Sequence, residues 1–130
     1  MTAGEFRTGI SVAFHASHSL KGNFGPACEV HPHDYRLDVA VGGNALTDGG
    51  ILIDIVQLEG AVRGLVDRWD GRCLDELAEL QGINTTVEAL ARFVHEHISR
   101  ELRDYADFRL EVKVWESPTI WGAYQAPIIS

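Results

Sequence analysis

Three histidines in the first third of the chain have the spacing of a metal site. His31 and His33 are two residues apart, so in a strand their side chains point to the same face. His18 ends an earlier run of residues that alternates in the same way. If the two runs pair as antiparallel neighbours, the three imidazoles converge at one end of one sheet face. Three imidazoles with a fourth position open to water or substrate are typical of a catalytic zinc site.

Cys28 leaves a second interpretation of this site open. It lies three residues before His31, and its thiolate could close the site as a fourth protein ligand. Such a site would be structural, because structural zinc normally has four protein ligands. A single histidine at the end of an apolar strand is more often a surface or hydrogen-bonded residue than a ligand. The presence of three on one alternating face favours the metal site.

Composition limits the class of protein. A chain of 130 residues fits one domain, which we expect to span residues 1–130. The formal net charge of −8 argues against nucleic acid, which is bound by clustered Lys and Arg. No run approaches the roughly 18 apolar residues of a membrane span, and the first residues lack the form of a signal peptide. We therefore expect a cytoplasmic protein with a small-molecule partner and no membrane or nucleic-acid partner.

Periodicity and capping signals predict the order strand, strand, helix, helix, strand, strand. The first two strands are the alternating runs at residues 10–18 and 31–41. Asp54 has the position of the N-cap of a helix that ends near residues 70–71. Thr85, with Glu88 three residues later, predicts a capping box and a second helix to about Arg103. Residues 73–82 fit a short helix or an ordered loop, and residues 108–116 and 120–124 predict the last strands.

This order predicts an α+β domain in which two helices cover one face of a four-stranded antiparallel sheet. The open edges of so small a sheet favour a cyclic homo-oligomer. In the second helix, we interpret His95 and His97 as surface or stripe-edge residues and not as ligands. Glu116 ends the apolar row of the third strand, where a carboxylate is costly. It lies either in water beyond the core or in a site for a cationic or amide-like ligand.

Five segments of the chain form a recognisable set: Phe14–His18, Cys28–Tyr35, Gly50–Asp54, Asn84–Glu88 and Val114–Glu116. In this order and spacing they resemble the signature segments of the 6-pyruvoyltetrahydropterin synthase and 6-carboxytetrahydropterin synthase family. The resemblance covers nearly the whole chain. It implies the tunnelling fold, in which ββααββ subunits join edge to edge into a barrel. The resemblance further implies a trimer or a stacked homohexamer, with active sites between subunits.

The resemblance also implies a zinc-dependent lyase or synthase. Such an enzyme abstracts a proton next to a zinc-bound oxygen of a pterin-type substrate, dihydroneopterin triphosphate or a related molecule. Glu116 would anchor the guanidine-like edge of the pterin, because a carboxylate suits a planar N–C–N donor edge. The other implied roles are Zn2+ binding by His18, His31 and His33, catalysis by Cys28 as thiol base and by Asp70, and lining of the substrate pocket by Thr85 and Thr86.

Three positions depart from the family pattern. Pro32 stands where the family usually has Gly, and Cys28 lies closer to His31 than in the synthases. Gly71 replaces the histidine that should follow Asp70, so the usual proton relay is missing. Two alternatives therefore stay open. One is a divergent enzyme of a specialised biosynthetic pathway with a different substrate, and the other is a non-catalytic pterin-binding protein.

Overall fold

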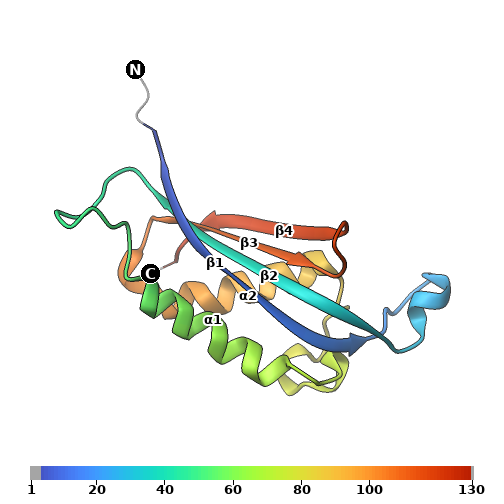
Figure 1. Cartoon of the computed structure of the whole chain (residues 1–130). Helices are drawn as coiled ribbons and strands as arrows, with labels where there is room; N and C mark the ends of the chain where they lie inside the picture. Colours follow the sequence, from blue (N-terminus) through green and yellow to red (C-terminus); the bar gives the residue numbers. More distant parts are fainter. Residues whose placement is uncertain (1–3, 130) are drawn as a thin grey trace.

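Four strands form one antiparallel sheet, and two helices cover one of its faces (Figure 1). The computed structural model describes residues 4–129. Strand order follows the chain, from β1 to β4. The elements are β1 (Phe6–His18), β2 (His31–Gly43), α1 (Ile55–Trp69), α2 (Val87–Glu101), β3 (Arg109–Trp115) and β4 (Trp121–Pro127). The predicted α+β architecture is confirmed.

The β1–β2 hairpin carries the predicted metal ligands at its far end. Its register pairs His18 with His31 and Ala16 with His33. The same alternation turns the apolar side chains of both strands toward the helices. The buried members of this face are Val12, Phe14, Ala16, Tyr35, Leu37, Val39 and Val41. Figure 1 shows the end of this hairpin, with the loop that follows β1, projecting beyond the helices.

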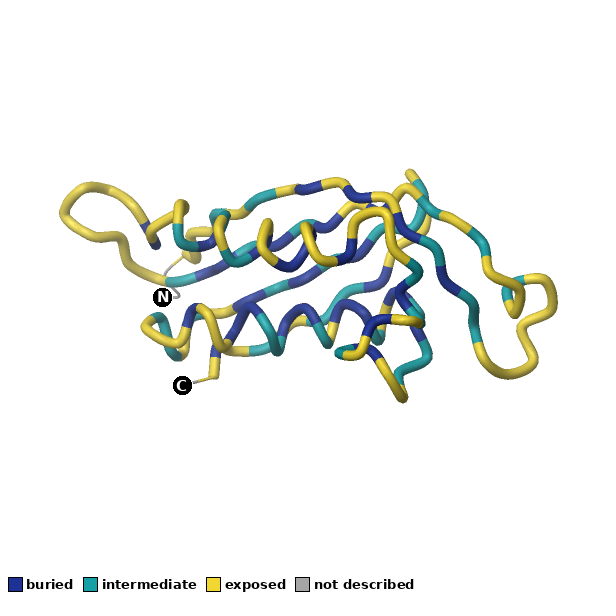
Figure 2. The backbone as a smooth tube through the Cα atoms, turned by 90° about the horizontal axis from the view of Figure 1, so that it is seen from below, coloured by how far each residue is buried: buried dark blue, intermediate teal, exposed yellow. Residues whose placement is uncertain are grey.

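Each helix packs an apolar stripe against the sheet. Figure 2 shows buried segments at intervals along both helices, alternating with intermediate and exposed ones, as expected for amphipathic helices on one sheet face. Ile55, the first residue of α1, is 43% exposed and lies outside the core. The buried stripe residues are Leu58, Val62, Leu65 and Trp69 in α1 and Leu90, Val94 and Ile98 in α2. Among residues 4–129, no helix has the length and apolar character needed to cross a membrane.

The predicted N-cap is correct for α1 but not for α2. Asp54 caps α1 as predicted, and its Oδ1 accepts a hydrogen bond from Val56 N at 3.0 Å. The cap predicted for α2 is wrong by one residue, because Thr86 and not Thr85 accepts from Ala89 N at 3.1 Å. The Thr85 hydroxyl is unavailable as a cap because it donates to a carboxylate elsewhere, described below. The predicted end of α2, near residue 103, lies two residues beyond its observed end.

The segment between the helices is an ordered connection with two 3₁₀ turns, Leu74–Glu76 and Ala78–Leu80. Before these turns, the chain runs along the outer edge of β1. Gly71 N donates to His15 O at 2.6 Å, and Ser17 N donates to Arg72 O at 3.0 Å. These hydrogen bonds fix the end of β1 that carries the first predicted metal ligand.

His95 is buried, with 1% of its surface exposed, so the prediction of a surface or stripe-edge position is wrong. Its Nε2 lies 3.1 Å from Ala126 O, and its ring meets the Tyr124 ring edge-on at 4.9 Å. A hydrogen bond to a backbone carbonyl satisfies the buried imidazole. His95 therefore connects α2 to β4 and is not part of a metal cluster.

Replacing Thr86 with alanine tests the corrected cap. We expect Thr86→Ala to lower the free energy of unfolding by about 1 kcal/mol, because it removes the side-chain acceptor for Ala89 N. Urea denaturation measures the change. Thr119→Ala is the matched control, since Thr119 is exposed in the turn between β3 and β4. An equal loss in both variants would contradict the assignment of Thr86 as the cap.

Candidate metal centre

The end of the β1–β2 hairpin brings the three predicted ligands together. One ring nitrogen from each of His18, His31 and His33 lies within 4.8 Å of the other two. The ring centroids are 4.6 Å apart for His18 and His31, 4.8 Å for His31 and His33, and 5.0 Å for His18 and His33. The convergence expected from strand alternation is therefore present on one sheet face.

Backbone carbonyls orient two of the three rings. His18 Nδ1 lies 2.8 Å from Thr85 O, and His31 Nδ1 lies 2.7 Å from Glu29 O. A carbonyl only accepts, so each Nδ1 carries the proton and donates it. The lone pair of each ring is then on Nε2, the nitrogen available to a metal. Histidines that bind metals are commonly held by such outer hydrogen bonds.

Two of the ring nitrogens are buried and have no hydrogen-bond partner in the described part of the chain. They are Nε2 of His18 and Nε2 of His33. Glu116 Oε2 lies 3.3 Å from His33 Nε2, close enough for charge attraction but not aligned as a hydrogen bond. A buried nitrogen without a partner is costly, and a cation would satisfy both atoms. The donor set therefore fits a metal ion of the zinc type, with three imidazoles.

Burial lowers the pKa of His18 and the pKa of His33 below the usual 6.5. For His18 the hydrogen bond to Thr85 opposes this effect, and the neighbouring imidazoles add to it. For His33 the charge of Glu116 opposes it. Metals bind the neutral imidazole, so a lowered pKa reduces competition from protons. The environment of the cluster thus favours the metal-binding form of His18 and His33.

Asp75 supports the histidine cluster indirectly, through hydrogen bonds to Thr85 and Ser19. This role was not predicted from the sequence. Its Oδ1 accepts from the hydroxyl of the fully buried Thr85 at 3.0 Å, and its Oδ2 accepts from Ser19 N at 2.7 Å. Since the Thr85 carbonyl holds His18, Asp75 joins the end of β1 to the start of α2. The sequence offers no signal for this contact except an acidic residue in a segment without clear periodicity.

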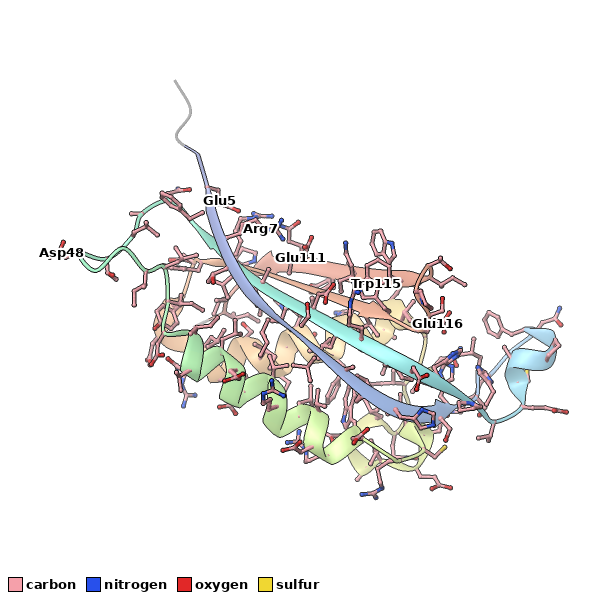
Figure 3. The ribbon with its side chains drawn as sticks, viewed as in Figure 1. Glu5, Arg7, Asp48, Glu111, Trp115 and Glu116 are labelled. Carbon is pink, nitrogen blue, oxygen red and sulfur yellow. The ribbon has the colours of Figure 1, made fainter. Side chains whose placement is uncertain are left out.

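Glu116 lies directly after β3, beside the histidines. Its side chain is only 24% exposed, so the carboxylate does not lie in open water beyond the core. Figure 3 labels it at the end of the sheet nearest the tip of the β1–β2 hairpin. A partly exposed carboxylate next to a possible cation is available to bind a ligand with hydrogen-bond donors.

Cys28 and Asp70 do not join the histidine cluster. Cys28 is exposed in the turn Gly25–Cys28, and its Sγ lies 3.1 Å from Gly22 O, to which it donates. It is therefore not a fourth ligand in this conformation. Asp70 ends α1, and its Oδ1 accepts from His15 N at 2.9 Å. Gly71 has a φ of +74°, a conformation that favours glycine, so a histidine there would be strained.

Lowering the pH should destabilise the metal-free protein. Because the folded protein lowers the pKa of His18 and His33, the unfolded chain binds more protons as the pH falls below about 6.5. The free energy of unfolding should therefore decrease between about pH 7.5 and about pH 5.5. Urea denaturation after removal of metal with a chelator measures this. An identical profile in the double variant His18→Gln, His33→Gln would contradict the explanation.

Comparison with known proteins places this chain in one family. The family described as 6-pyruvoyl tetrahydropterin synthase matches residues 9–127. A Dictyostelium discoideum protein named 6-pyruvoyl tetrahydrobiopterin synthase is 31% identical over 104 residues, which cover 78% of this chain and 75% of the relative. A Haemophilus influenzae protein named 6-carboxy-5,6,7,8-tetrahydropterin synthase is 24% identical over 142 residues, covering 92% of this chain and 99% of the relative.

Solved structures agree with the sequence comparison. The structure of the 6-pyruvoyl tetrahydropterin synthase of Caenorhabditis elegans has a TM-score of 0.80 at 20% identity and covers 97% of this chain and 99% of its own. The Plasmodium falciparum 6-pyruvoyl tetrahydropterin synthase has a TM-score of 0.75 at 16% identity, covering 95% and 99%. At these identities the likeness shows a shared fold. With the family match and the Dictyostelium relative, it establishes that the chain belongs to the 6-pyruvoyl tetrahydropterin synthase family.

Proposed function

We propose that this protein is a zinc-dependent lyase or synthase that acts on a pterin-type substrate, dihydroneopterin triphosphate or a related molecule. The observation that carries the proposal is the histidine cluster, in which the Nε2 atoms of His18 and His33 are buried and unpaired. A zinc ion held there would polarise an oxygen of the substrate side chain and make the neighbouring C–H more acidic. Carbon–oxygen or carbon–carbon bond cleavage could then follow proton abstraction.

Glu116 is the proposed anchor for the pterin ring. The N–C–N edge of a pterin presents two parallel donors, and a carboxylate can accept both. Glu116 is partly exposed and 3.3 Å from a metal ligand, which supports a pocket shared by ring and reacting side chain. Thr85 and Thr86 come from the chain just before α2 and are proposed to line this pocket. The Thr85 carbonyl contacts His18, while the Thr85 hydroxyl donates to Asp75 and the Thr86 hydroxyl accepts from Ala89 N.

Cys28 is the proposed base. It is an exposed free thiol in the loop at the tip of the hairpin, and a nearby dication would stabilise its thiolate. Its hydrogen bond to Gly22 O must break before the thiolate can reach a substrate. Asp70 remains a catalytic candidate of second rank, because it already holds the backbone of His15 and lacks the family's histidine partner at residue 71.

We also infer a homo-oligomer, either a trimer or a hexamer. Both edges of the sheet carry exposed apolar side chains, Phe6 on β1 and Trp121 on β4. Pairing of β1 in one copy with β4 in the next would close the sheet and remove both edges. Each site would then bind a small molecule, and the protein partners of the chain would be other copies of itself.

A different substrate, in a specialised biosynthetic pathway, is the second candidate. Two observations favour it. The resemblance implies a histidine at the position of Gly71, and Lys21 is the only basic residue in the loop from residue 19 to residue 30, which is little for a triphosphate. A non-catalytic pterin-binding protein is the third, and it shares the metal and the ring anchor but not the chemistry.

Incubation of the zinc-loaded protein with dihydroneopterin triphosphate tests the function. We expect elemental analysis to find about one zinc per chain. Chromatography should show conversion of the pterin. His33→Ala should lose both metal and conversion. Stoichiometric zinc with bound but unconverted pterin would favour the third candidate, and zinc without pterin binding would favour the second. Protein that takes up no zinc would contradict the proposal.

Two variants separate binding from chemistry. Cys28→Ala should keep zinc and pterin binding, while turnover falls roughly 10²- to 10⁴-fold through loss of the base. Glu116→Gln should keep zinc but weaken pterin binding by about 10- to 100-fold, because an amide cannot accept both donors of the ring edge. Calorimetry and steady-state kinetics measure these effects. Cys73→Ala is the thiol control, and a turnover loss there equal to that of Cys28→Ala would remove the specific role of Cys28.

A further inference from the structure

The Tyr35 hydroxyl is a third buried polar group without a partner at the metal centre. Among the described residues, the buried side-chain nitrogen and oxygen atoms that lack a hydrogen bond are Nε2 of His18, Nε2 of His33 and Oη of Tyr35. A metal ion accounts for the two nitrogens. It does not account for the hydroxyl, which is a hydrogen-bond donor and acceptor in its own right.

The Tyr35 ring is packed directly against the histidines. Tyr35 follows His33 by two residues on β2, so both side chains are on the same face. Its ring centroid lies 5.4 Å from that of His33 and 6.0 Å from that of His18, edge-on to both. Phe14 stacks on the ring at 5.0 Å, and only 1% of the residue is exposed. The hydroxyl therefore cannot turn out to solvent.

Other groups near Tyr35 do not satisfy its hydroxyl. Glu116, Asp75 and Cys73 are the ionisable side chains whose charges act on the Tyr35 hydroxyl. These groups come from the end of β3 and from the segment before α2, the same elements that border the histidine cluster. None of them is hydrogen-bonded to Oη. A buried phenol O–H among acceptors is a donor that still needs an acceptor of its own.

We propose that the Tyr35 hydroxyl donates a hydrogen bond to the oxygen atom, of water or substrate, that completes the coordination of the metal. The proposal rests on the metal site of the proposed function and adds a group that orients the substrate oxygen. Phenylalanine would fill the same space without an unpaired hydroxyl. The hydroxyl is thus a cost to the metal-free fold that binding of an oxygen ligand would recover.

Tyr35→Phe separates this role from a structural one. The urea midpoint of the metal-free variant should equal or exceed that of the wild type, since no hydrogen bond is lost. Zinc affinity, measured by chelator competition, should fall by no more than about tenfold, because the hydroxyl contacts the oxygen ligand and not the metal itself. Acetohydroxamate, a small oxygen ligand, should bind the cobalt-substituted variant about tenfold more weakly, as followed by visible absorption.

Tyr105→Phe is the matched control. The Tyr105 hydroxyl accepts from Asp54 N at 3.0 Å, near the start of α1, so its loss should lower the urea midpoint and leave acetohydroxamate binding unchanged. Wild-type affinity for acetohydroxamate in Tyr35→Phe would overturn the inference and leave the proposed function standing. Destabilisation of metal-free Tyr35→Phe equal to that of Tyr105→Phe would also overturn it, because the hydroxyl would then have a structural partner. Failure of the wild type to bind zinc would overturn both proposals.

Discussion

The register between β1 and β2 is the constraint on which the rest of the molecule depends. Pairing of His18 with His31 and of Ala16 with His33 sets which side chains share a face. A slip of one residue would send the histidines of the two strands to opposite faces and would also expose the apolar row of one strand. The alternation that buries the core therefore also assembles the histidine cluster, and neither can change alone.

Burial gives the centre its chemical character. Removal from water favours the neutral form of His18 and His33, and the carbonyls of Thr85 and Glu29 leave Nε2 of the His18 and His31 rings without a proton. Two adjacent threonines at the start of α2 have different roles. Thr85 donates to Asp75 and holds the His18 ring through its carbonyl, and Thr86 caps the helix. The position of the site is thereby coupled to the position of α2 on the sheet.

Period-two alternation and capping signals were sufficient to predict the element order and the three converging histidines, because both are local patterns with a direct geometric meaning. Contacts between distant segments were not predictable in this way. The predicted capping box at Thr85 is wrong because the Thr85 hydroxyl donates to Asp75, which lies in a segment without periodicity. His95 was misplaced because its partner, the carbonyl of Ala126, lies on another element. The orientation of Cys28 depends on loop geometry that no repeat encodes.

The two edge strands differ in length, with 13 residues in β1 and 7 in β4. In a ring of copies, a neighbouring β4 could cover only about half of β1. The remaining stretch, next to the histidine cluster, is already bonded to the chain's own residues 70–73. In the proposed ring, one long strand would serve assembly with its first half and carry His18 of the candidate metal centre in its second. Changes in the proposed contacts between copies would then leave the histidine cluster undisturbed.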